Sequence, residues 1–92
     1  MAVLSQQELE ASLNGSEWSR DGEAIVREWQ LEDFAAAIAF VNRVAELAEE
    51  ANHHPDIELH GWNKVRLRMS THSEGGVTAA DLDMAGRIDA LG

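Results

Sequence analysis

The feature that most constrains this sequence is the stretch from residue 33 to residue 52, in which apolar residues recur with the period of an α-helix. Their steps along the chain are four, three, four and three, and further apolar positions widen the stripe. The main stripe consists of Phe34, Ile38, Val41, Ala45 and Ala48, widened by Phe40, Val44 and Leu47. A stripe this broad has to pack against another element. The sequence therefore predicts a long helix that covers a sheet.

The same stretch carries signals for both helix ends. Asp33 opens it, and Pro55 disfavours helical backbone at the residue before it, so we expect the helix to end near Asn52. The side left toward water holds Asn42, Arg43, Glu46, Glu49 and Glu50. We therefore expect no unexplained apolar patch on the solvent side of this helix.

Two further helices are predicted by capping boxes, in which a Ser or Thr is followed three residues later by an acidic residue. Ser5 and Glu8 precede a short helix that should end near Leu13, before the Asn14-Gly15 pair. Thr78 and Asp81 precede a last helix. Its apolar positions are Leu82, Ala85, Ile88 and Leu91.

Four other stretches alternate polar and apolar residues or are rich in strand formers, and a turn signal lies within each pair. The first pair is residues 17–19 and 24–31, joined by a turn at 20–23. Along 24–31 the apolar side is interrupted by Arg27. The second pair is residues 56–60 and 64–71, with a turn at 61–63. The sequence thus predicts two β-hairpins.

The resulting order is α-β-β-α-β-β-α within one domain, residues 1–92. This order favours an α+β two-layer fold, with a four-stranded antiparallel sheet and three helices on one face. Sheet edges in so small a domain are open to pairing with another copy, so a homodimer or homotetramer is expected.

Composition excludes several functional classes. Seventeen acidic against seven basic residues give a net charge of −10, which repels nucleic acids and anionic membranes. Lys64, Arg66 and Arg68 alternate along one predicted strand, which favours a solvated face. The sequence has no cysteine, so disulfides and thiol nucleophiles are excluded. No stretch approaches the roughly 20 apolar residues of a membrane span, and we expect a cytoplasmic protein.

All four histidines lie between residues 53 and 72: His53, His54, His60 and His72. If strand 64–71 runs antiparallel to its partner, it returns His72 toward the His53-His54 pair. Three interpretations are open: polar loop residues, metal ligands, or acid–base groups that titrate near neutral pH. Adjacent histidines point apart in regular structure and no HExxH spacing is present, so the metal interpretation is the least favoured.

A wider pattern surrounds these histidines. It consists of Glu49-x-x-x-His53-His54-Pro55, then Trp62-Asn63-Lys64-Val65, then Ser70-Thr71-His72, and then Asp81. Taken together, the pattern resembles the signature of the pterin-4a-carbinolamine dehydratase family, and the similarity extends from Trp18 to the C-terminus. The resemblance implies dehydration of 4a-hydroxytetrahydropterin to quinonoid dihydropterin, the recycling step after an aromatic amino acid hydroxylase.

This reaction delivers a proton to the leaving hydroxyl and removes one from the pterin nitrogen N5, so acid–base groups suffice without a metal or cofactor. The resemblance implies a catalytic set of His53, His54 and His72. Within it, His53 and His72 form the acid–base pair and His54 anchors the pterin. The residues expected to bind or orient are Glu49, Pro55, Trp62, Ser70, Thr71 and Asp81. The two carboxylates among them would fix imidazole tautomers.

Structural alternatives stay open for several of these residues. Asp81 also fits a simple helix cap, Glu49 a solvated helix position, and Trp62 a packing aromatic of the hairpin. A functional alternative is open as well, because animal members of the family also act as dimerisation cofactors of a homeodomain transcription factor. The chain could accordingly be a non-catalytic dimerisation or assembly cofactor with the same fold.

Overall fold

The computed structural model describes residues 2–91, which form three helices and four strands in the predicted order. These are α1 (Gln6–Leu13), β1 (Ser19–Asp21), β2 (Ala24–Gln30), α2 (Phe34–Ala51), β3 (Asp56–His60), β4 (Lys64–Met69) and α3 (Ala79–Asp89). The predicted α+β class is confirmed. Among the described helices, none combines the length and the apolar character needed to cross a bilayer.

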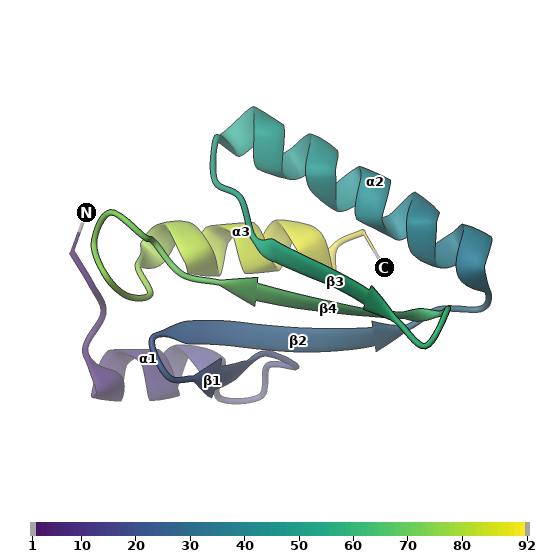
Figure 1. The fold of residues 1–92 in the computed structure, drawn as a ribbon. Coiled ribbons are helices and arrows are strands. Elements are labelled where there is room, and N and C mark those ends of the chain that lie inside the picture. Colours follow the sequence, from purple (N-terminus) through teal and green to yellow (C-terminus); the bar gives the residue numbers. More distant parts are fainter. Residues whose placement is uncertain (1, 92) are drawn as a thin grey trace.

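The four strands form one antiparallel sheet in the order β1-β2-β4-β3, so β4 is paired on both sides. Because side chains alternate along a strand, the register places Ile25 beside Met69 and Trp29 beside Val65 on one face. The long helix α2 runs across this face, with α3 beside it (Figure 1). The opposite face carries Lys64, Arg66 and Arg68, which are partly exposed, and Arg66 and Arg68 lie near Asp21.

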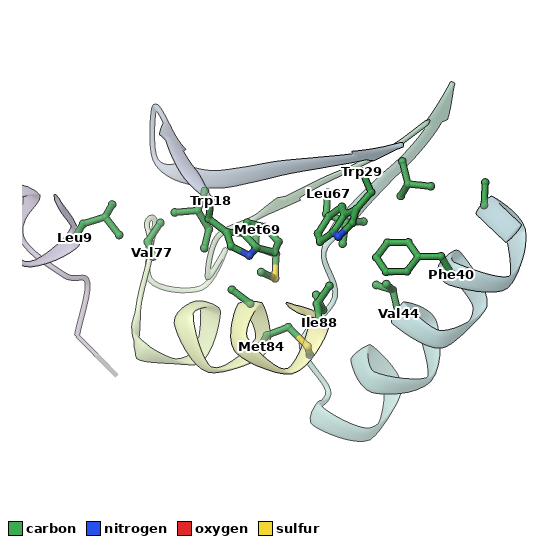
Figure 2. Close-up of a cluster of buried hydrophobic side chains, with 14 residues drawn as sticks. Leu9, Trp18, Trp29, Phe40, Val44, Leu67, Met69, Val77, Met84 and Ile88 are labelled. Atoms are coloured by element: carbon green, nitrogen blue, oxygen red, sulfur yellow. The ribbon is translucent and has the colours of Figure 1, made fainter. Parts of the chain in front are cut away.

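The hydrophobic core fills the space between the sheet and its helices (Figure 2). From the sheet, Trp29 points to Phe40 of α2, with ring centroids 4.9 Å apart. Met69 faces Met84 of α3 in the same view. Leu9 of α1 joins the cluster from the β1 side, so all three helices contribute to one core.

Arg27, which interrupts the apolar side of β2, is accommodated by an ion pair and an aromatic ring. Its Nη1 lies 2.7 Å from Asp89 Oδ1, and the same oxygen accepts a 2.8 Å hydrogen bond from Trp18 Nε1. The guanidinium carbon lies 4.4 Å from the ring centroid of Trp29, in cation–π geometry. The charge on the packed side of the sheet is thus paired with a carboxylate and stacked on an aromatic ring.

The first hairpin differs from its prediction in its bounds. β1 covers Ser19–Asp21, whereas residues 20–21 were predicted to belong to the turn. The strands pair up to Asp21 and Ala24, which leaves a two-residue connection at Gly22-Glu23. Gly22 has φ +61°, the left-handed conformation that such tight hairpin turns require.

The face that α2 buries also differs from the prediction. Its buried residues are Ala37, Phe40, Val44 and Ala48, whereas Phe34 is 54% and Ile38 is 39% exposed. The expectation that this helix carries no exposed apolar patch is therefore wrong. The apolar stripe is broader than the surface that the sheet and α3 cover, so one of its edges remains in solvent.

Candidate active site

One end of the sheet brings together the end of α2, the end of β4 and the start of α3 (Figure 1). A pocket of about 280 Å³ lies there. It is lined by Asn52, His53, His54, Ser70, Thr71, His72 and Ser73. The predicted return of His72 toward the His53-His54 pair therefore occurs, and it is helped by a β-bridge from Thr71 to Gly76 that folds the loop back.

A larger hollow of about 580 Å³ lies between α1 and β1. Its lining consists of Gln7, Glu10, Ala11, Leu13, Asn14, Trp18, Ser19 and Arg20. None of these is an imidazole, and the hollow contains no pair of groups suited to move a proton both ways. The smaller pocket, with three imidazoles, is therefore the candidate active site.

The end of α2 explains why the two neighbouring histidines have different surroundings. Asn52 takes a left-handed conformation with φ +51°, and the backbone N–H of His53 donates to the Ala48 carbonyl at 3.0 Å. This arrangement closes the helix and turns the chain sharply. His53 consequently points into the protein, with 18% of its side chain exposed, while His54 stays on the surface. Pro55 follows at once and is half-buried.

His53 is held by a buried carboxylate. Its Nε2 lies 2.6 Å from Oδ1 of Asp81, which is fully buried. The other oxygen of Asp81 accepts hydrogen bonds of 2.9 Å from the Thr71 hydroxyl and 2.9 Å from the Thr78 backbone N–H. A buried carboxylate with this many donors is well satisfied, so Asp81 can orient the imidazole rigidly.

His54 has a carboxylate partner of a different kind. Its Nε2 bonds Glu49, which lies near the end of α2, and both side chains are exposed. The spacing of five residues lets the turned chain fold back on the last helical turn. An exposed pair of this type is screened by water and contributes little stability.

Trp62 of the pattern and His60, the fourth histidine, both lie away from the pocket. Trp62 is at the tip of the β3–β4 hairpin, at the opposite end of the sheet, and β4 separates it from the pocket by roughly 20 Å. It is 61% exposed with φ +60°, so it neither lines this pocket nor packs in the hairpin as the alternative expected. His60 pairs with Glu28 at 3.3 Å, on the open face of the sheet.

Thr78 was missed as a site residue. It is fully buried, and its hydroxyl lies 2.8 Å from the hydroxyl of Thr71. The capping box identified it as a helix cap, but its contact with the strand end depends on tertiary packing. Across residues 2–91, no three side chains of the metal-ligating types gather closely enough to hold an ion.

Comparison with known proteins identifies the family, because residues 2–91 match the family model described as Pterin 4 alpha carbinolamine dehydratase. The chain belongs to this family of hydro-lyases. A relative that carries the family's name, from Nocardia farcinica, is 48% identical over 90 residues, which cover 97% of this chain and 94% of the relative. Another, from Roseiflexus castenholzii, is 47% identical over 91 residues, with 98% and 97% covered.

Two solved structures have similar folds. A transcriptional coactivator/pterin dehydratase from Brucella melitensis superimposes with a TM-score of 0.89 at 34% identity, covering 97% of both chains. A pterin dehydratase-like protein described as a RuBisCO assembly factor in the alpha-carboxysome gives 0.70 at 26% identity, with 82% of this chain and 88% of the other covered. Members of this fold are thus described with roles beyond dehydration.

Proposed function

We propose that the protein dehydrates 4a-hydroxytetrahydropterin to quinonoid dihydropterin and water, and so recycles the pterin after an aromatic amino acid hydroxylase. The observation that carries this proposal is the convergence of His53, His54 and His72 on one pocket. Membership of the dehydratase family supports it. The pocket, about 280 Å³, is close to the lower end of the size range of small-molecule sites, as a bicyclic pterin requires.

The reaction moves two protons, one to the departing 4a-hydroxyl and one away from N5. In our proposal His53 and His72 carry these transfers, because they come from different elements and so reach different parts of a bound ring. His53 has the fixed position, held by Asp81. His54, paired with Glu49, binds and orients the pterin. Pro55 and Ser70 shape the pocket wall, and the pterin needs no further cofactor.

The test is the decay of the 4a-hydroxypterin absorbance with and without the protein. We expect a clear acceleration over the spontaneous rate, and a fall of about 10²-fold or more in His53→Ala and in His72→Ala. His60→Ala is the matched control, because His60 faces the open side of the sheet and should leave the rate unchanged. A wild-type protein that gives only the spontaneous rate would contradict the proposal.

The assembly that we propose is a homodimer or homotetramer, supported by the exposed apolar side chains of Phe34 and Ile38 on α2. The same side chains favour the second candidate function, a dimerisation or assembly cofactor. Sedimentation of the wild-type protein separates monomer from oligomer. The two functions are separated by the absorbance assay, since a cofactor without catalysis leaves the spontaneous rate unchanged.

A cytoplasmic location stays a prediction.

A further inference from the structure

The hydroxyl groups behind His53 form a continuous set of hydrogen bonds. Thr71 Oγ1 lies 2.9 Å from Asp81 Oδ2 and 2.8 Å from Thr78 Oγ1. Thr78 Oγ1 in turn accepts a 3.2 Å bond from the backbone N–H of Ala80, in the first turn of α3. The set therefore runs from the start of α3, through two hydroxyls, to the carboxylate that holds His53.

The direction of every proton in this set follows from counting donors. A hydroxyl has one proton to donate, and an ionised carboxylate can only accept. Thr71 must therefore donate to Asp81, which leaves Thr78 as the donor in the bond between the two hydroxyls. Thr78 can do so because the Ala80 N–H donates to its oxygen. With Asp81 ionised, all of these protons point toward Asp81, and no other arrangement satisfies the same contacts.

The N-terminus of α3 also stabilises the negative charge of Asp81. Asp81 occupies the third position of α3, where the helix N-terminus favours an anion. With Oδ2 occupied by Thr71 and the Thr78 N–H, Oδ1 is left to accept from His53. With Asp81 ionised, the proton in that bond is on Nε2 of the imidazole.

We infer that Thr71 and Thr78 are positioning residues, whose aligned hydroxyls fix Asp81 so that neutral His53 carries its proton on Nε2 and exchanges protons with the substrate through Nδ1. The tautomer rests on the geometry and on an ionised Asp81. The exchange with substrate rests on the proposed dehydratase function. A loss of the Thr71 hydroxyl removes one donor from Asp81 and leaves the Thr78 hydroxyl without an acceptor, although the Thr78 N–H still holds the carboxylate.

The experiment pairs two substitutions at residue 71. Thr71→Val keeps the shape of the side chain and removes the hydroxyl, whereas Thr71→Ser keeps the hydroxyl. Because a reacting group displaced by about 1 Å can lose about 10²-fold in rate, partial loosening of His53 should lower kcat about tenfold, with KM changed less than twofold. Thr71→Ser should restore kcat to within twofold. If the substitutions act only by disturbing the strand, kcat should fall in both variants or KM should change.

A second measurement does not depend on activity. The ¹⁵N spectrum of the wild-type protein at alkaline pH should show His53 protonated at Nε2 and unprotonated at Nδ1, with a downfield proton on Nε2. In Thr71→Val that proton resonance should move upfield or broaden. If wild-type His53 is protonated at Nδ1, or if Thr71→Val keeps the full kcat, the inference is wrong. An Nε2 proton in a protein without dehydratase activity would reject the proposed function and leave the tautomer standing.

Discussion

The helices α1 and α3 begin with the same arrangement, an N-cap hydroxyl and an acidic residue three positions later that bond each other's backbone N–H groups. In α1 the pair is Ser5 and Glu8, and both lie on the surface. In α3 the pair is Thr78 and Asp81, and both are fully buried. The local chemistry is identical in kind, but the surroundings differ completely.

The difference shows how a capping carboxylate can also bond a side chain of the candidate site. Glu8 uses Oε1 to accept from the Ser5 N–H at 2.9 Å, in open solvent. Asp81 accepts from the Thr78 N–H with Oδ2 and has Oδ1 directed at His53. Because α3 starts beside the ends of α2 and β4, its capping carboxylate lies directly behind the pocket. Asp81 therefore caps α3 and bonds His53 at the same time, and this geometry is compatible with both interpretations that the sequence left open.

The largest effect is expected for Asp81→Asn. An amide has one acceptor oxygen instead of two, so either His53 or the donors from Thr71 and Thr78 must face an NH₂ group. We expect a loss of about 3 kcal/mol in the free energy of unfolding, because a buried bonded charge is removed from its partners. The dehydration rate should fall about 10²-fold as His53 loses its position. Urea titration and the absorbance assay measure the two effects.

The matched control for this substitution is Asp83→Asn on the same helix. Asp83 is exposed and pairs with Arg87 at 3.1 Å, an i,i+4 contact that contributes only about 0.3–0.5 kcal/mol. The dehydration rate of Asp83→Asn should equal that of the wild type. Equal losses in both variants would mean that the burial of Asp81 is unimportant, and the contrast between the two helix starts would not hold.

A smaller effect should follow from exchanging the acids of the two capping boxes. Glu suits the third position of a helix at least as well as Asp, so local rules alone predict that Asp81→Glu is harmless. Asp81 is fully buried and bonded through both oxygens, so an added methylene has to displace these bonds. We expect a loss of about 1–3 kcal/mol together with a lower kcat. Glu8→Asp, the reverse exchange on the surface, should change the urea midpoint far less. Comparable midpoints for the two variants would contradict this.

Local signals in the sequence predicted most of the fold. Caps, turn glycines and alternation gave all seven elements in order, since each depends on residues within a few positions of one another. For α2, the prediction that its whole apolar stripe is covered was wrong, because the stripe is broader than the contact surface and only the packed sheet decides that Phe34 and Ile38 stay exposed. The bounds of β1 shifted because Gly22 allows a tighter turn than expected.

The parts of the candidate site that depend on local turns and on strand direction could be predicted from the sequence. The turn at Asn52 and the antiparallel return of β4 bring His53, His54 and His72 together, as the pattern indicated. Two features depend on tertiary packing and could not be predicted. Trp62 belongs to the same pattern but lies at the far end of the sheet, and Thr78 meets Thr71 only because α3 packs against the end of β4. Neither spacing nor residue type reveals such contacts.

The smallest effect concerns the charge of Glu8 and its pH dependence. The Ser5 backbone N–H, and then the Ser5 side chain, lower the pKa of Glu8 in the folded protein. Its contribution to stability is therefore present above the pKa of the unfolded chain and is lost as the pH falls through the lower, folded value. Glu8→Gln should reduce the urea midpoint slightly at neutral pH, and the difference from wild type should shrink under acidic conditions, with no change in dehydration rate. A difference that stays constant or grows toward low pH would show that the exposed capping box does not stabilise the protein through the charge of Glu8.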